Sequence, residues 1–275
     1  MKMRRSVFNK GIVNLVLIII GLLFVVPLLW VITAAFNKNP TLVVQVPSPF
    51  SLQNFREVLT ASNGDSFLNS FYLSAGTAIF TVILAMLAAY PLSRYQLRFK
   101  RPFMYTILFV TGLPITAMMV PVYEVYNTLH IVDSLFWTGV FLVASSLPYA
   151  IWLTKNFMDG VPIELEEAAW VDGASVLTAL RRIIFPLMRP GLSAVGIFIF
   201  VLSWGNFFVP FILIQSSGLD PAAVTIYQFF AQYGLVAYGE LAAFSVLYTL
   251  PVVVLYTLSS RGFGGAFSFG GAVKG

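Results

Sequence analysis

Long apolar stretches alternate with short charged segments along this chain. Six stretches hold no Asp, Glu, Lys or Arg and are rich in Leu, Ile, Val and Phe: 11–36, 66–93, 102–123, 134–154, 190–219 and 241–260. A helix needs about 20 apolar residues to cross about 30 Å of hydrocarbon, where only an internally hydrogen-bonded backbone is stable. Each stretch is long enough. The pattern therefore predicts an all-α membrane protein with six transmembrane helices.

Composition and charge agree with this prediction and orient it. The chain has 59% hydrophobic and only 10% charged residues, whereas about 25% are charged in a soluble domain. Of its 16 Lys and Arg residues, all but Lys38 and Arg56 fall in the two ends or in the connections after the second and fourth stretches. Because short basic loops stay in the cytoplasm, both termini are predicted to be cytoplasmic. The net charge of +5 then reflects membrane topology, and we do not expect nucleic-acid binding.

Two further segments bear on this count. Residues 221–239 are also free of charge, but they contain glutamines, and counting them as a span would move Arg261 and Lys274 to the other side. We interpret this segment as an external helix. The first stretch is longer than the roughly 7–15 apolar residues of a signal peptide, so we expect a membrane anchor.

Outside the spans, no segment is long enough to fold separately. We therefore predict a single transmembrane domain, residues 1–275, with a cytoplasmic loop at about 157–189 and a cytoplasmic tail at 261–275. The external loop 37–65 carries three prolines, and we expect a short helix in it near residues 52–59.

Several kinds of chemistry are excluded by what the sequence lacks. There is no cysteine, which rules out disulfides and thiolate chemistry, and no Gly-rich phosphate-binding loop ending in Gly-Lys-Ser/Thr. No carboxylate lies at the centre of a predicted span, although ion-driven carriers usually keep one there. We expect neither an enzyme nor a bound cofactor or metal, and we expect any energy for transport to come from another polypeptide.

The connection between the fourth and fifth stretches has the pattern of two short helices. Pro162 suits a first turn, and Gly173 can end the helix with a positive φ. A second helix is expected from about 175 to 184, stopped by Pro186. Three carboxylates fall where the positive end of the helix dipole favours them: Glu164, Glu166 and Glu167.

This connection is predicted to dock a protein. Ala168 and Ala169 are small enough for a partner to approach closely, and Glu167 can pair with a partner's arginine. The alternative is an amphipathic loop resting on lipid headgroups. Anionic lipid would repel the three carboxylates, which favours protein docking.

The spacing in this connection is similar to the EAA motif of permease subunits in ATP-binding-cassette (ABC) importers. Phe185 replaces the usual Leu of the motif. Further runs, 147–153, 161–169, 172–175 and 271–275, resemble the MalG-like, maltose-permease branch of carbohydrate importers, whereas Trp204-Gly205-Asn206 departs from it. The motif reads Glu167-Ala168-Ala169, three residues, Gly173, nine residues, Ile183, one residue, Phe185-Pro186.

The resemblance implies a type I ABC importer permease fold, multi-pass in a bacterial inner membrane, that carries a sugar, oligosaccharide or polyol. It implies four partners: a second homologous permease, two ATPase subunits that bind ATP and Mg²⁺, and an external solute-binding protein. The tail would reach the ATPase interface, or else be disordered. The residues expected to couple to the ATPase are Glu167, Ala168, Ala169, Gly173, Ile183 and Pro186.

The external loop 213–239 and the fifth helix hold candidates for the transport pathway or for binding-protein contact: Trp204, Asn206, Tyr227, Gln228, Gln232 and Tyr233. In a membrane bundle such aromatic and amide side chains more often serve packing than transport. Two other functions stay open, a stand-alone secondary carrier or channel and a membrane scaffold without transport. An ATPase and a sister permease that co-purify with the chain would distinguish the importer from both.

Overall fold

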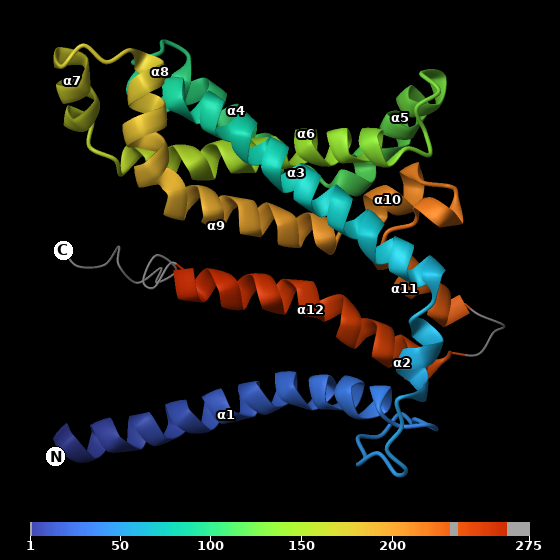
Figure 1. Cartoon of the computed structure of the whole chain (residues 1–275). Coiled ribbons are helices and arrows are strands. Elements are labelled where there is room, and N and C mark those ends of the chain that lie inside the picture. The colour runs from blue at the N-terminus through green and yellow to red at the C-terminus, as the bar shows by residue number, and fades with distance from the viewer. Residues whose placement is uncertain (1, 232–235, 263–275) are drawn as a thin grey trace. The chain divides into compact units, whose positions relative to one another are not determined.

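The structure is a computed structural model that describes residues 2–231 and 236–262 (Figure 1). Within these residues the regular structure is helical. The α-helices are α1 Lys2–Ala35, α2 Gln53–Val58, α3 Ala61–Arg94, α4 Lys100–Thr111, α5 Ile115–Thr128, α6 Leu135–Asp159, α7 Glu164–Val171, α8 Val176–Ala179, α9 Phe185–Trp204, α10 Phe208–Leu213, α11 Ala222–Ala231 and α12 Tyr238–Gly262. A π-helical turn covers Leu180–Ile184 and a 3₁₀ turn Ser217–Leu219.

The predicted membrane architecture is confirmed. In the described residues, five helical segments are long and apolar enough to cross a membrane: Val13–Ala35, Ala61–Arg94, Leu135–Asp159, Val176–Trp204 and Tyr238–Ser259. A sixth crossing forms if α4 and α5 count as one broken span. The cytoplasmic placement of both termini and the single domain stay predictions.

The third apolar stretch was expected to be one helix, and this was wrong. Helix α4 ends at Thr111, α5 begins at Ile115, and the two are bent by 92°. Pro114 stands before α5 with an extended backbone, φ −67° and ψ 120°. Proline has no N–H to give and disfavours the helical region for the residue before it, so the helix breaks here.

The expected stop at Pro186 was also wrong. The chain is helical from Val176 to Trp204, because α8 continues through the π-helical turn into α9. The Phe185 N–H donates to the Leu180 carbonyl, five residues back. This wider turn places Pro186 in the first turn of α9, where the N–H that proline lacks matters least. The fifth span therefore begins before residue 190 and ends well before residue 219.

The described helices group into two compact units. The first comprises residues 1–64 and 225–251. The amide of the buried Asn54 on α2 donates to the carbonyls of Ala35 and Asn37, over 3.0 and 2.8 Å. A Cβ at Gly239 would come within 2.5 Å of the Asn54 side-chain oxygen, so glycine is required for this approach. Helix α2 confirms the short helix expected near residues 52–59.

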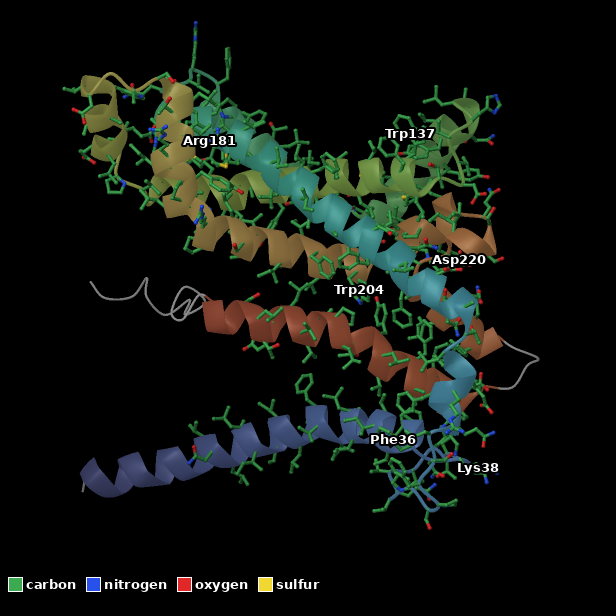
Figure 2. The ribbon with its side chains drawn as sticks, viewed as in Figure 1. Phe36, Lys38, Trp137, Arg181, Trp204 and Asp220 are labelled. Carbon is green, nitrogen blue, oxygen red and sulfur yellow. The ribbon has the colours of Figure 1, made fainter. Side chains whose placement is uncertain are left out.

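The second unit comprises residues 65–224 and 252–275 and holds the predicted docking loop. Helix α6 packs against both α4 and α9. One buried cluster joins α3, the end of α6 and the start of α9: Met86, Ala89, Tyr90, Met158, Val161, Ile184, Met188 and Leu192. Figure 2 labels Arg181 and Trp204 near the two ends of the long helix that runs from Val176 to Trp204.

Candidate functional site

The first half of the docking loop has the geometry that the sequence predicts. Helix α7 carries all three glutamates in its first turn, although it begins at Glu164, after Pro162. Gly173 has φ +84°. Its N–H donates to the Trp170 carbonyl over 3.0 Å, and the Ala174 N–H donates to the Ala169 carbonyl over 2.9 Å. The left-handed glycine thus ends the helix and turns the chain toward α8.

Helix α7 presents part of the motif to solvent and buries the rest. Glu167, Ala168 and Gly173 are exposed, whereas only 9% of Ala169 is accessible. Val171 is 87% exposed and Trp170 36%, so apolar surface lies beside the exposed charge. An exposed face of mixed apolar and acidic character is available for a partner.

The second half of the motif is held to the rest of the chain by one deeply buried side chain. Ile183 and Pro186 are only partly buried, whereas their neighbour Ile184 has no accessible surface. Ile184 belongs to the cluster that joins α3, α6 and α9. The side chain that fixes this half of the loop is therefore one that the motif leaves unspecified.

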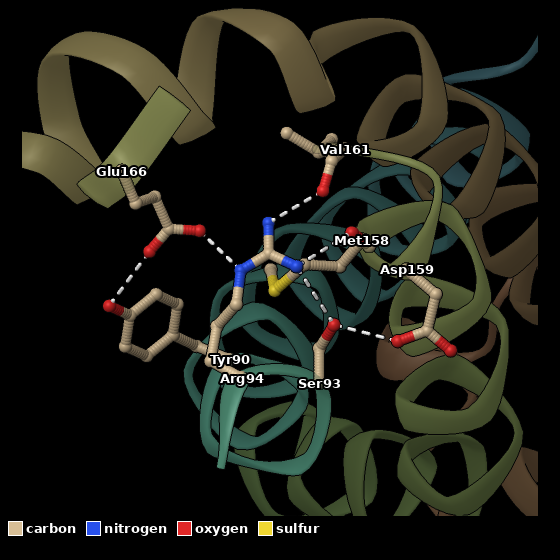
Figure 3. Close-up of polar contacts among 7 residues, drawn as sticks. All are labelled: Tyr90, Ser93, Arg94, Met158, Asp159, Val161 and Glu166. Atoms are coloured by element: carbon tan, nitrogen blue, oxygen red, sulfur yellow. Dashed lines mark hydrogen bonds and ion pairs between the residues drawn. The ribbon is translucent and has the colours of Figure 1, made fainter. Parts of the chain in front are cut away.

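A buried ion pair fixes helix α7 from behind (Figure 3). The Arg94 Nε, at the end of α3, pairs with the Glu166 carboxylate, and their side chains are 5% and 0% exposed. The Tyr90 hydroxyl donates to the other carboxylate oxygen over 3.1 Å. The remaining guanidinium nitrogens donate to the carbonyls of Met158 and Val161, over 3.2 and 3.1 Å.

The network extends to the end of α6. Figure 3 shows Ser93 between Arg94 and Asp159: the guanidinium donates to the Ser93 hydroxyl over 3.3 Å, and this hydroxyl donates to Asp159 over 2.7 Å. Asp159 also pairs with Lys155. A buried ion pair offsets its cost of desolvation only when such extra hydrogen bonds satisfy it. Helix α7 is thereby tied to both α3 and α6.

Only one feature of the sequence points to this network. Glu166 stands between two other glutamates in a first turn, and we expected all three to serve the exposed surface. Its partner Arg94 lies 72 residues earlier. The one available signal was that both residues fall on the predicted cytoplasmic side.

A cavity of about 540 Å³ lies in the same unit, between α4, α5, α6 and α9. Among the pathway candidates Asn206 lines it, and the Asn206 side chain also accepts from the Val209 N–H over 3.1 Å. Trp204 is only 3% exposed and stacks on Phe200, with ring centres 5.7 Å apart, so it serves packing. The polar part of the lining consists of Thr111, Ser145, Ser146, Tyr149, Ser203 and Asn206.

Tyr227 and Gln228 are not among the residues that line this cavity. Tyr227 and Gln228 are exposed on α11 and belong to the first unit. Gln232, Tyr233 and residues 263–275 of the predicted tail lie outside the described residues. Among the residues that the structure describes, no three His, Asp or Glu side chains gather where a metal ion could bind.

Comparison with known proteins identifies the class to which this fold and loop belong. The family model for the binding-protein-dependent transport system inner membrane component matches residues 81–264, more than half of the chain. The chain therefore belongs to this family of membrane-embedded transport components. It is a multi-pass membrane protein and a permease subunit, not itself an enzyme.

The chain is similar to individual permease proteins over nearly their whole length. The chain is 26% identical to the diacetylchitobiose uptake system permease protein DasC of Streptomyces coelicolor, covering 94% of this chain and 95% of the relative. It is 27% identical to the arabinooligosaccharides transport system permease protein AraQ of Halalkalibacterium halodurans, covering 100% of both. A third relative, the trehalose transport system permease protein SugB of Mycobacterium tuberculosis, is 28% identical over 90% of this chain and 92% of its own.

Solved structures show the same fold. A chain of a bacterial ABC transporter involved in the import of the acidic polysaccharide alginate superposes with a TM-score of 0.81 at 22% identity, covering 94% of this chain and 98% of its own. A second structure, of an alginate transporter in complex with its alginate-bound periplasmic protein, gives a TM-score of 0.68 at 14% identity, covering 94% and 95%. The predicted type I importer fold and the MalG-like resemblance are thus confirmed.

Proposed function

We propose that this chain is the permease subunit of an ATP-driven importer for a sugar, oligosaccharide or polyol, and that helix α7 is where ATPase movement enters the membrane domain. The family depends on a binding protein, and the relatives named above are permease proteins of uptake or transport systems for diacetylchitobiose, arabinooligosaccharides and trehalose. ATP and Mg²⁺ would be bound by two ATPase subunits, and a second permease would complete the membrane domain.

One observation carries the coupling role. Helix α7 exposes Glu167 and Ala168 on one side, while Glu166 on the other side is buried in an ion pair. A force applied to the exposed face passes through Arg94 into α3 and through the hydrogen-bonded carbonyls into the end of α6. Because α8 runs into α9 without a break, the same force reaches the fifth span along one helix.

The cavity beside α9 is the surface that we assign to the transported solute. Its serine and threonine hydroxyls and the Asn206 amide can hydrogen-bond a hydroxyl-rich ligand. Its aromatic wall, Tyr149 and Phe198 with ring centres 5.0 Å apart, suits the apolar face of a sugar ring. None of the described lining residues carries a charged side chain, so the cavity favours a neutral solute.

Two substitutions test the coupling role. Glu167→Ala removes the exposed charge of the motif, and Gly173→Leu places a branched side chain at φ +84°, which costs about 1–2 kcal/mol for a residue other than glycine. Both should weaken retention of the ATPase and abolish uptake in reconstituted vesicles while membrane insertion stays normal. The matched control is Glu164→Ala, an exposed glutamate of the same turn that lies outside the motif.

Other outcomes would point elsewhere. Full uptake by both variants would remove the coupling role from α7. Uptake by this chain alone, driven by an ion gradient, would support a secondary carrier or channel. An ATPase that co-purifies with the chain but never supports uptake would support a scaffold.

A further inference from the structure

A basic pocket, which shares no lining residue with the cavity described above, lies at the charged end of α4. It has a volume of about 780 Å³ and is formed by the connection between α3 and α4, the first turns of α4 and the last turns of α6. All of these segments belong to the second unit. Four of its side chains are cationic: Arg98, Lys100, Arg101 and Lys155.

Most of this positive charge is not neutralised within the chain. Among the described residues that line the pocket there is no Asp or Glu. Lys155 pairs with Asp159, but within the described part of the chain Arg98, Lys100 and Arg101 form no ion pair. The Arg98 guanidinium lies 6.0 Å from the centre of the Phe99 ring, an uncharged neighbour that leaves its positive charge in place. The pocket therefore favours a negatively charged ligand.

The part of the pocket farther along α4 is lined by apolar and aromatic side chains. Along α4 the cations are followed by Met104, Tyr105 and Leu108, which also line it. At 1.5 Å per residue, Leu108 lies about 12 Å along the helix from Lys100. The pocket therefore extends from the basic segment before residue 102 into the uncharged stretch 102–123. On α6, Trp152 completes the wall, and Trp and Tyr are the side chains that favour the membrane–water interface.

We propose that this pocket binds the phosphate headgroup of an anionic phospholipid, with the acyl chains lying along the exposed face of α4. Basic pockets between membrane helices recognise such headgroups. An acidic protein surface would pair with the cations but would leave the apolar part of the pocket without a matching partner. Tyr105 and Phe109, which follow the cations along α4, are 70% and 72% exposed and match acyl chains instead. This inference does not rest on the proposed transport function.

The test measures which lipid the protein keeps. The chain, with the subunits that accompany it, is purified from nanodiscs of phosphatidylglycerol and phosphatidylcholine, and the retained lipid is identified by native mass spectrometry. Lys100→Gln/Arg101→Gln removes two pocket charges, and Lys38→Gln/Arg56→Gln removes the same two charge types elsewhere. A third variant, Lys100→Arg/Arg101→Lys, exchanges the two residues and keeps their charge.

We expect the natural protein to retain phosphatidylglycerol in preference to phosphatidylcholine. Lys100→Gln/Arg101→Gln should retain at least fivefold less phosphatidylglycerol than the natural protein. Lys38→Gln/Arg56→Gln and Lys100→Arg/Arg101→Lys should retain as much as the natural protein. Equal retention of both lipids by the natural protein, or no loss in the neutralised variant, would overturn the proposal. So would displacement by millimolar inorganic phosphate, which indicates a site for free phosphate, or lipid retention only after the ATPase is removed, which indicates that a protein occupies the pocket.

Discussion

Glu166 and Glu167 are neighbours in the chain, yet their surroundings are opposite. Consecutive side chains on a helix point in directions about 100° apart, so a helix lying on a protein surface buries one and exposes the next. Here Glu166 meets Arg94 and Tyr90, and Glu167 meets solvent. One carboxylate is thus structural, while the next is available to a partner.

The buried pair should be sensitive to the loss of one partner. Glu166→Gln leaves the Arg94 guanidinium buried without a counter-ion, and breaking a buried pair in this way costs about 3–5 kcal/mol. The free energy of unfolding in detergent should fall by this amount, with greater proteolysis at residues 164–175. Exposed Glu164→Gln should change it by less than about 0.5 kcal/mol. If the two variants are equally stable, the ion pair does not hold α7.

Among the secondary-structure elements, the connections set how consecutive helices join or bend. A π-helical turn joins α8 to α9 where a proline would otherwise end the helix, and the break at Pro114 bends α4 against α5 by 92°. A third connection depends on Asp133, which has φ +62°. Its carboxylate accepts from the backbone N–H groups of Gln215 and Ser216, both over 2.9 Å. It thereby joins the loop before α6 to the chain after α10.

This Asp133 contact should depend on pH. The Ser216 hydroxyl first, then the backbone N–H groups of Ser216 and Gln215, lower the pKa of Asp133 below its ordinary value. A lowered pKa in the folded state means that the stabilisation is present above the ordinary carboxyl pKa of about 3.9 and is lost as the pH falls through the lower folded value.

The protection of the Gln215 and Ser216 amides from hydrogen exchange should therefore drop at acidic pH. Asp133→Asn keeps an acceptor, tolerates a positive φ and should abolish this part of the pH dependence. The pKa of Asp220 is raised, by burial and then by the Asp133 charge, so its titration acts in the opposite direction. Protection that varies with pH equally in the natural protein and in Asp133→Asn would contradict the assignment.

At the scale of the whole molecule, the absence of cysteine makes the predicted topology directly measurable. Single cysteines at Ala174, in the docking loop, and at Lys38, before α2, need no substituted background. A membrane-impermeant maleimide should label Lys38→Cys from outside intact cells and Ala174→Cys only after the membrane is opened. Labelling of both from the same side would overturn the predicted orientation and, with it, access of a cytoplasmic ATPase to α7.

Five of the six predicted spans and the position of the docking loop in the chain followed from the sequence, because apolar length and charge are local properties of the chain. The positive φ of Gly173 followed for the same reason. Three features did not follow: the pairing of Arg94 with Glu166, the burial of Ile184 and the continuity of α8 with α9. Each depends on which segments meet in space.

The order of residues alone is enough to show a membrane protein with a helix–glycine–helix element between its fourth and fifth spans, since hydrocarbon thickness and backbone geometry leave little choice. Which glutamate of that element is buried, and which is exposed to a partner, depends on the folded chain. A buried charge is stable only where a distant part of the chain brings a counter-ion and hydrogen-bond donors to it.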